Sequence, residues 1–204
     1  MYKRAAGLYN WFIEPFLAPV KRRVAAICRE RGYRTILDLC CGTGTQCMLL
    51  EAQGCEVFGV DESPEMLSVA KRVSPPAVGY YLEKASRTHF PDAYFDGVII
   101  AHALHENPPE GRAGMLREAQ RVVRPGGGII LVDYVAADDF VSELAALFVR
   151  TLEAAAGRQN YRNFSGFMRD GGLRGSLRRS GLREIEFCRF HLGATGLAIA
   201  RRPG

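Results

Sequence analysis

An acid-flanked glycine loop is the feature of this sequence that most directly suggests ligand chemistry. The segment 38–46, DLCCGTGTQ, follows a short apolar run, and Gly42 and Gly44 permit positive φ angles and a close approach of a ligand to the backbone. Asp61 follows Gly42 by nineteen residues and ends a second apolar run. A carboxylate at that place can accept hydrogen bonds from the two hydroxyls of a ribose. The pattern predicts a site for a nucleoside-containing cofactor.

The same loop favours a cationic adenosine compound over a dinucleotide. A dinucleotide fingerprint would place a third glycine at position 47, where this chain has Cys47. Asp38, an acid at the end of the first apolar run, suits a ligand with an amino group and a positive charge. S-adenosylmethionine has both and a nicotinamide dinucleotide has neither, so a nicotinamide oxidoreductase is the weaker alternative.

Two histidines supply candidates for acid–base chemistry. His102 and His105 follow the apolar run FDGVIIA at 95–101, and each is a candidate base or polarising group for a methyl acceptor, with Tyr134 and Tyr161 behind them. His105 is equally well explained as a packing or helix-start residue. No cysteine or histidine pair has the spacing of a zinc site, and we expect no metal.

The elements that must position these residues alternate between strand and helix patterns. Strands are predicted at 34–40, 56–60, 78–82, 95–101, 129–134, 183–190 and 195–201. Helices are predicted at 46–53, 64–73, 109–123, 138–155 and 167–180, with a polar loop at 157–165 and a turn at Gly126–Gly128. Strands separated by helices pair in parallel, whereas the last two should form an antiparallel hairpin. The expected class is α/β, a doubly wound Rossmann-like seven-stranded sheet with helices on both faces.

Four segments together resemble the successive motifs of class I S-adenosylmethionine-dependent methyltransferases. They are ILDLCCGTGTQ, VFGVDESPEML, FPDAYFDGVIIAHALHE and LREAQRVVRPGGGIILVDY, and they are most similar to the branch of the ubiquinone/menaquinone-biosynthesis C-methyltransferases. The resemblance covers roughly residues 30–135. It implies the strand order 3-2-1-4-5-7-6 with the last strand antiparallel. It also implies one domain over 1–204, with a helical cap at 1–30, a cofactor-binding core at 31–135, and a helix plus hairpin at 136–204.

The resemblance also implies which residues contact S-adenosylmethionine. The glycine loop lies under the methionine and ribose, and Glu62 or Met66 flanks the adenine. Lys84-Ala85 stands where the family has Asp-Ala, and because lysine cannot accept a hydrogen bond, Glu83 or Ser86 must serve as the acceptor. The implied cofactor contacts are Tyr9, Asp38, Cys40, Gly42, Thr43, Gly44, Asp61, Glu62, Met66, Lys84, Ala85 and His102.

Composition limits the class of protein and its partners. Of 204 residues, 48% are hydrophobic and 24% charged, which excludes bulk disorder. The net charge of +5 permits an acidic partner without requiring one. Six cysteines without a CxxC pair indicate reduced thiols in a cytoplasmic protein. The aromatic and basic N-terminal segment is expected to pack as a lid or helix on the core, with peripheral membrane contact as the alternative.

The predicted function is methyl transfer to a small-molecule acceptor, quinone-like or otherwise lipophilic, by a monomer or homodimer. The basic pI of 9.0 raises the alternative of a nucleic-acid or protein methyltransferase. A nucleic acid partner is not expected, because no interleaving of aromatic and basic residues typical of RNA binding is found in the sequence. Lys84 raises a third interpretation, a partner subunit that binds the cofactor without catalysing transfer.

Overall fold

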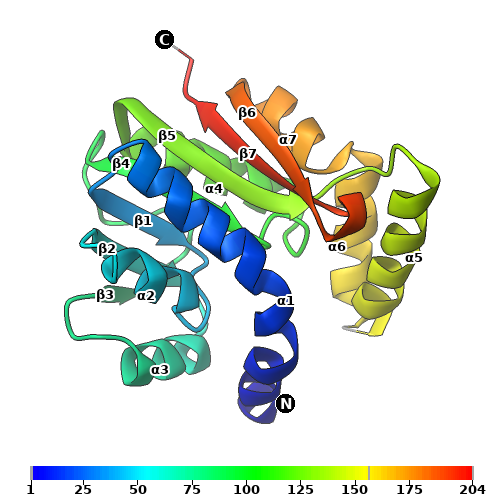
Figure 1. Ribbon diagram of the computed structural model, residues 1–204, viewed down its shortest axis with the longest axis horizontal. Helices are drawn as coiled ribbons and strands as arrows, with labels where there is room; N and C mark the ends of the chain where they lie inside the picture. The colour runs from blue at the N-terminus through cyan, green and yellow to red at the C-terminus, as the bar shows by residue number, and fades with distance from the viewer. Residues whose placement is uncertain (1, 156, 204) are drawn as a thin grey trace.

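The computed structural model describes the backbone of residues 2–155 and 157–203, and side chains from Glu14 onward except those at 148, 152, 155, 156 and 204. A single sheet of seven strands runs through it in the order β3-β2-β1-β4-β5-β7-β6 (Figure 1). The first five strands pair in parallel, and β7 pairs antiparallel with both β5 and β6. The predicted class, strand order and reversed last strand are confirmed.

The strands are β1 (Thr35–Leu39), β2 (Glu56–Asp61), β3 (Gly79–Leu82), β4 (Phe95–Ala101), β5 (Val123–Tyr134), β6 (Arg183–Phe190) and β7 (Thr195–Arg201). The helices are α1 (Tyr2–Glu30), α2 (Thr45–Glu51), α3 (Pro64–Val73), α4 (Pro109–Val122), α5 (Phe140–Ala155), α6 (Arg158–Arg169) and α7 (Gly172–Ser180). A short 3₁₀ turn, η1 (His191–Gly193), joins the last two strands.

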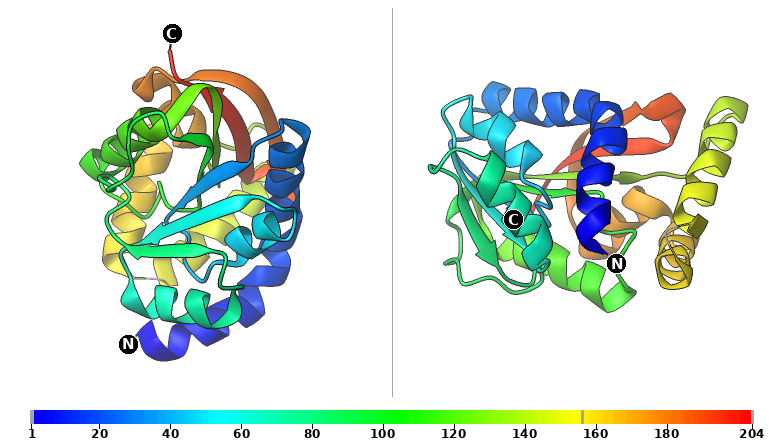
Figure 2. Two further views of the ribbon diagram at one scale, coloured as in Figure 1. Left: turned by 90° about the vertical axis from the view of Figure 1, so that its left-hand side faces the viewer. Right: turned by 90° about the horizontal axis from the view of Figure 1, so that it is seen from below.

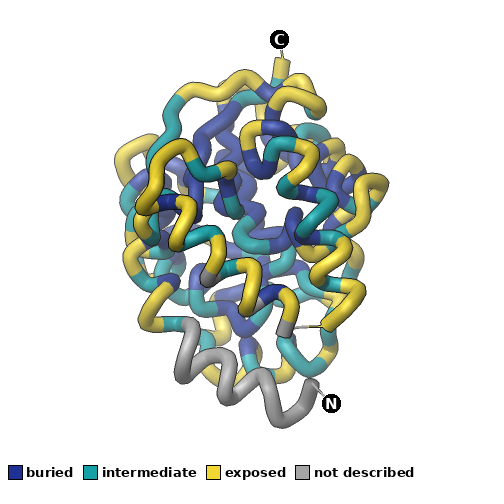
Figure 3. Tube along the Cα trace, turned by 90° about the vertical axis from the view of Figure 1, so that its right-hand side faces the viewer, coloured by how far each residue is buried: buried dark blue, intermediate teal, exposed yellow. Residues whose placement is uncertain are grey.

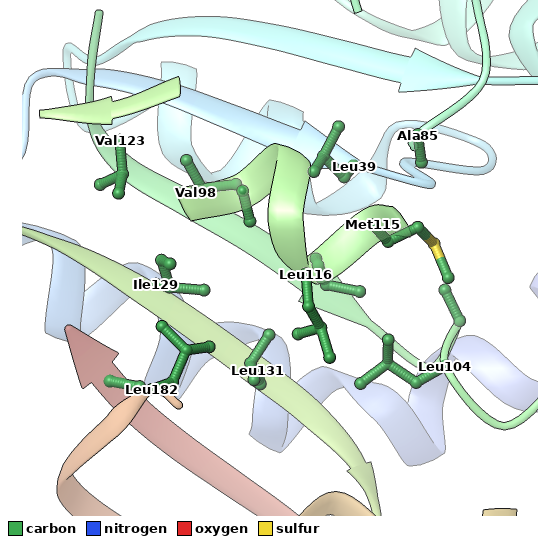
Figure 4. Packing of buried hydrophobic residues seen from close by; sticks show 14 of the residues in the cluster. Leu39, Ala85, Val98, Leu104, Met115, Leu116, Val123, Ile129, Leu131 and Leu182 are labelled. Carbon is green, nitrogen blue, oxygen red and sulfur yellow. The ribbon is translucent and has the colours of Figure 1, made fainter. Parts of the chain in front are cut away.

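Helices cover both faces of the sheet (Figure 2). Side chains alternate along each strand, so Leu37 and Leu39 of β1 join a cluster with α4 and α7, whereas Ile36 joins a cluster with α1 and α2. Figure 4 shows the first cluster, in which Leu116 of α4 lies among side chains of the central strands. Because the central strands are buried on both faces, they read as continuous apolar runs in the sequence.

Two predictions about helices were wrong. Residues 158–165 belong to helix α6, which begins with the polar stretch RQNYRN and has its buried side chains, Phe164 and Phe167, only in its second half. The helix predicted at 167–180 is divided into α6 and α7, because Gly171 and Gly172 adopt positive φ angles of 88° and 58°.

The glycine run at 126–128 lies inside β5 rather than in a turn before it. Gly128 pairs with Gly97 of β4, and both pack against the ring of Tyr33. A Cβ atom at position 128 would lie 2.1 Å from the Tyr33 hydroxyl, which leaves room only for glycine. Gly128, the last glycine of the run, is therefore explained by close packing against a buried ring.

The six cysteines are free thiols, and no disulfide is found among the described residues. No helix in the described part of the chain is both long and apolar enough to cross a membrane. The cytoplasmic location and the division of the chain into cap, core and hairpin stay predictions.

Candidate active site

Backbone strain marks the carboxyl ends of the two central strands. Cys40, directly after β1, has a φ of 64°, and His102, directly after β4, has a φ of 53°. Non-glycine residues rarely adopt such angles, and they persist where the surroundings over-determine the backbone, as at ligand sites. β1 and β4 are neighbours, and the strand order reverses between them. Ligands of open α/β sheets bind at this switch point, so the strained residues face the expected crevice.

Asp61 holds the glycine loop from the next strand. Its Oδ2 accepts a hydrogen bond of 2.8 Å from the backbone N–H of Gly42, and its Oδ1 accepts one of 2.9 Å from Ser63. Because a carboxylate has about four acceptor positions and Asp61 is only half-buried, two positions remain for ribose hydroxyls. The residue thus both shapes the loop and keeps capacity for a ligand.

The two glycines of the loop have different roles. Gly42 has a φ of 55°, and a Cβ atom built on it would meet nothing within 4 Å. Gly44 has a φ of 78°, and a Cβ atom there would lie 2.1 Å from the Tyr80 hydroxyl. Gly42 therefore faces open space where a ligand can approach the backbone, whereas Gly44 lets the loop pack against Tyr80.

Asp38 lies buried beneath this loop, at 2% exposure. Burial raises the pKa of its carboxyl to about 7, although the Cys47 thiol donates to its Oδ2 over 3.5 Å. The residue at position 47, which departs from the dinucleotide pattern, is therefore a partner of this acid. A cationic ligand close to Asp38 would favour its ionised form, since no cation hydrogen-bonds to it within the described residues.

The remaining cofactor candidates lie around the same loop. Thr43 is buried, with its hydroxyl 3.4 Å from that of Thr45, and the Cys40 thiol points toward the Met115 sulfur at 3.7 Å. Glu62 is exposed and Met66 half-buried at the start of α3, where the Met66 N–H donates to Ser63. The side chain of Tyr9 lies outside the described residues, so its predicted contact stays a prediction.

The two acceptors expected beside Lys84 and Ala85 differ in their contacts. Ala85 is buried and Lys84 exposed, after β3. Both carboxylate oxygens of Glu83 bond to His89, at 3.0 Å from its backbone N–H and 2.6 Å from its Nδ1. Glu83 keeps free acceptor positions despite these bonds, and Ser86 is exposed, so both stay predicted acceptors.

His105 is a buried imidazolium between two carboxylates. Its Nδ1 lies 2.7 Å from Asp133 Oδ1, and its Nε2 lies 3.5 Å from Glu153 Oε1. Burial alone would lower the pKa of His105, but the charge of Asp133 and the hydrogen bonds to both acids outweigh it and raise the pKa to about 10. The same pairing lowers the pKa of Asp133 despite its complete burial. A ring protonated on both nitrogens cannot accept a proton, so this geometry disfavours the predicted base role for His105 and favours a structural one.

His102 has the opposite character. Its Nε2 is buried and finds no hydrogen-bond partner in the described part of the chain. Burial is the main cause that lowers the pKa of His102 to about 4, assisted by the nearby charge of His105, while the carboxylate of Asp133 opposes the shift. The ring is neutral at physiological pH and keeps a lone pair. Of the two histidines, His102 is the one able to accept a proton.

Aromatic rings surround this pair of histidines. The Tyr134 ring centroid lies 5.8 Å from that of His102 and 4.6 Å from that of His105, and Phe164 of α6 packs against Tyr134 at 5.5 Å. Tyr161, one turn earlier on α6, is partly exposed at 40%. The surroundings of the two histidines are thus aromatic.

Helix α1 contacts the glycine loop through Glu14. The Glu14 carboxylate accepts from the Thr45 hydroxyl at 2.8 Å and pairs with Lys21. Phe16 stacks on His191 with ring centroids 3.7 Å apart, which ties α1 to η1. From Glu14 onward, α1 therefore contacts the core, and His191 has a structural contact that the sequence did not indicate. The side chains of residues 1–13 lie outside the described residues, so the lid and the membrane contact stay predictions.

Residues 36–127 match the family model of the methyltransferase domain. This segment, just under half of the chain, is thus similar to a methyltransferase domain. The match spans β1 through the glycine run of β5, and so includes Asp38, the glycine loop, Asp61 and both histidines. It supports S-adenosylmethionine as the cofactor, and the open backbone at Gly42 with the spare acceptor capacity of Asp61 fits that molecule.

The demethylmenaquinone methyltransferase of Thermus thermophilus is 34% identical over 119 residues, which is 56% of this chain and 53% of that protein. The chain spans about half the length of the curated relatives it matches. The PH0226 protein of Pyrococcus horikoshii superposes with a TM-score of 0.69 at 24% identity, over 96% of this chain and 91% of that one. Human N-acetylserotonin methyltransferase, solved with S-adenosylmethionine, has a TM-score of 0.66 at 18% identity, over 100% of this chain and 58% of its own. The two structures share the fold of the methyltransferase domain.

Three residues of this site were missed by sequence reasoning. The sequence pattern places Asp133 in the apolar run of β5 without a role, although an acid inside such a run itself indicates a buried polar contact. Glu153 and Arg112 occupy helices, where a single charged residue does not indicate which way it faces. Their roles depend on contacts made across the fold.

Proposed function

We propose that this protein transfers the methyl group of S-adenosylmethionine to a small aromatic acceptor. The observation that carries the proposal is the arrangement at the switch point. An acid with spare acceptor capacity, an open glycine backbone and a neutral histidine with an unused nitrogen lie at the ends of neighbouring strands. The family match of the domain and its demethylmenaquinone-methyltransferase relative support the reaction class.

Each group of the site has a distinct task in this proposal. Asp61 binds the ribose hydroxyls, and the ionised Asp38 attracts the amino group and positive charge of the cofactor. When bound, S-adenosylmethionine supplies a methyl group on a cationic sulfur. The protein then has to align the acceptor with that methyl group and exclude water, and such positioning can contribute on the order of 7–11 kcal/mol.

His102 takes the proton that the acceptor loses. The ring is neutral and its Nε2 is buried without a partner among the described residues, so in the tautomer with the proton on Nδ1 it can receive a proton from a phenol or from an activated ring carbon. Its strained backbone is held by a hydrogen bond of 2.7 Å from its N–H to the Val132 carbonyl. A general base of this kind typically contributes about 10²–10⁴-fold to the rate.

The cofactor half is tested by calorimetric titration with S-adenosylhomocysteine. We expect Asp61→Asn to weaken binding on the order of 100-fold, because hydrogen bonds to a charged carboxylate are worth about 1.5–3 kcal/mol each. Glu56→Gln, at the other end of β2, is the matched control and should leave the affinity within about twofold. Failure of the wild-type protein to bind at millimolar ligand, or full affinity in Asp61→Asn, would refute the proposal.

The acceptor class is tested by following transfer of a labelled methyl group to a panel of compounds. The panel holds a short-chain demethylmenaquinone analogue, simple catechols, an aliphatic amine and unmodified RNA. The aromatic lining formed by Tyr134 and Phe164 favours the quinone and catechol acceptors. Labelling of RNA alone would favour the nucleic-acid alternative, and tight cofactor binding without any transfer would favour a non-catalytic partner subunit.

A further inference from the structure

Helices α5 and α6 form a two-helix cap, residues 140–169, over the acceptor end of the sheet (Figure 1). Side chains on the outward side of α5, such as Phe140, Leu144 and Leu147, are exposed at 73%, 55% and 58%, so this side of the helix is not packed on the core (Figure 3). The contacts that attach the cap to the core decide whether the acceptor end is closed.

Beside the buried rings of Phe164 and Phe167, the cap is attached to the loop after β4 by polar and ionic contacts. Arg112 of α4, 4% exposed, donates from Nε to the carbonyls of Leu104 and Asn107, and from Nη2 to the Asn163 carbonyl of α6 at 2.6 Å. The Asn163 side chain in turn donates to the Glu106 carbonyl at 2.5 Å. The loop of residues 102–107, which carries His102, is thus bonded directly to α6.

The third attachment is ionic, and it comes from α5. Glu153, 9% exposed, places its Oε1 at 3.5 Å from His105 Nε2 and at 3.2 Å from the Tyr134 hydroxyl, which donates to it. The Nδ1 side of the imidazolium is held by Asp133. This carboxylate also accepts from the backbone N–H groups of Leu104 and His105 at 3.0 and 3.2 Å. We call His105, Asp133 and Glu153 the clasp.

The groups that face His105 from each packed element set its charge. Asp133 comes from β5, Glu153 from α5 and Glu106 from the same loop, with the Glu106 carboxylate 3.9 Å from Nε2. His102 is neutral, and Phe164 and Phe167 of α6 contribute rings 6.4 Å from the His105 ring. Three acids therefore face one imidazole, and the ring stays protonated.

We propose that Glu153 is a positioning residue of the methyl-transfer site, which docks the two-helix cap on the His102 loop through its ionic contact with His105 and its hydrogen bond with Tyr134. The cap then closes the acceptor end while His105 carries a proton. Closure of this kind excludes water and fixes the groups that face the substrate. The catalytic meaning of the clasp rests on the proposed function, whereas the docking itself does not.

Amide hydrogen exchange of the full chain tests the docking. We expect Glu153→Gln, which keeps a hydrogen-bonding amide and loses the charge, to speed exchange across 140–169 on the order of tenfold or more, with β4 and β5 unchanged. Glu143→Gln is the matched control, since Glu143 is exposed on the same helix and has no side-chain hydrogen bond or ion pair among the described residues. Equal exchange of the cap in the two variants would overturn the proposal, and so would faster exchange that includes β4 and β5 to the same extent.

Nitrogen-15 spectra of the histidine rings give a second readout that needs no stable variant. In the wild-type protein at pH 8 both ring nitrogens of His105 should be protonated, and a neutral ring would overturn the clasp. In Glu153→Gln the pKa of His105 should fall by about 1–3, because an opposite charge at this distance is lost. An unchanged pKa would count against the proposal.

Titration with S-adenosylhomocysteine separates the two proposals. Glu153 lies on the cap, away from the glycine loop, so its substitution should leave that affinity within about twofold. Absence of binding in the wild-type protein would refute the proposed function and leave the docking result intact. Normal binding with an undisturbed cap in Glu153→Gln would refute the clasp alone.

Discussion

On each side of the switch point an aspartate holds the loop of the neighbouring strand, but the two aspartates differ in what else they can bind. At the end of β2, Asp61 accepts backbone hydrogen bonds from the loop that follows β1. At the end of β5, Asp133 does the same for the loop that follows β4. In each case an outer strand supplies a carboxylate that fixes the loop of the inner strand beside it, and each loop contains a residue with positive φ.

The two aspartates differ in how many hydrogen-bond acceptor positions of the carboxylate remain free. Asp61 is half-buried and receives two backbone donors, which leaves acceptor positions open to the crevice. Asp133 is completely buried and receives three backbone N–H groups and an imidazolium. A carboxylate in the first state can bind a ligand, whereas one in the second state can only hold protein groups in place. The number of acceptor positions already taken by protein groups, rather than residue type or position on the strand, separates a binding residue from a positioning residue here.

The largest effect that this comparison predicts is on stability. Asp133→Asn leaves a buried imidazolium without its main counter-charge, and removing one partner of a buried pair costs about 3–5 kcal/mol. Asp61→Asn should cost clearly less, because solvent reaches its surroundings. Urea unfolding of the two variants measures the difference in the free energy of unfolding. The exposed pair of Asp92 with Arg121 supplies the control, since Asp92→Asn should cost at most about 1 kcal/mol. Equal losses at 133 and 61 would contradict the distinction.

A smaller effect is predicted for alanine substitutions of Gly42 and Gly44 in the glycine loop, which should differ in stability and in ligand affinity. An alanine at either position is strained by its positive φ, at a cost of roughly 1–2 kcal/mol. At Gly44 the added methyl group also meets Tyr80, so Gly44→Ala should lower the free energy of unfolding by more than Gly42→Ala does. Gly42→Ala should instead show its larger defect in S-adenosylhomocysteine affinity, since its methyl group projects into open space. Thermal unfolding with and without ligand distinguishes them, and the reverse order would contradict the division of tasks.

The cofactor side could be predicted from the sequence because its signals are local. Gly42 and Asp61 stand at a spacing fixed by one strand–helix–strand unit, so pattern and position determine each other. The parallel pairing and the final antiparallel hairpin followed from the alternation of strands and helices, whereas the strand order was implied by the resemblance to the methyltransferase family. These inferences needed no knowledge of which side chains meet across the fold.

The acceptor side could not be predicted in this way. The partners of His105 come from β5 and α5, and α5 follows the core motifs, where helix register sets which residue turns inward. The neighbouring α6 is not predicted from the sequence, because its first half, RQNYRN, is polar and resembles a loop, and its buried side chains lie only in the second half. The sequence left the roles of His102 and His105 open, and only their neighbours show that one is neutral and the other charged.

The smallest predicted effect sharpens the comparison through Asp38, the third acid at the switch point. Burial raises its pKa to about 7, so in the free protein this carboxyl is largely protonated below neutral pH. The folded state then binds a proton that the unfolded state has lost, and this contribution to stability falls as the pH rises toward 7. A cationic cofactor reverses the preference, because it stabilises the ionised carboxylate. We therefore expect S-adenosylmethionine to bind up to about tenfold more tightly per pH unit between pH 5.5 and 7, with release of up to one proton. Calorimetry in buffers of different ionisation enthalpy counts that proton. Asp38→Asn supplies the control and should remove both the release and the pH dependence, whereas release that persists in this variant would assign the proton to another group.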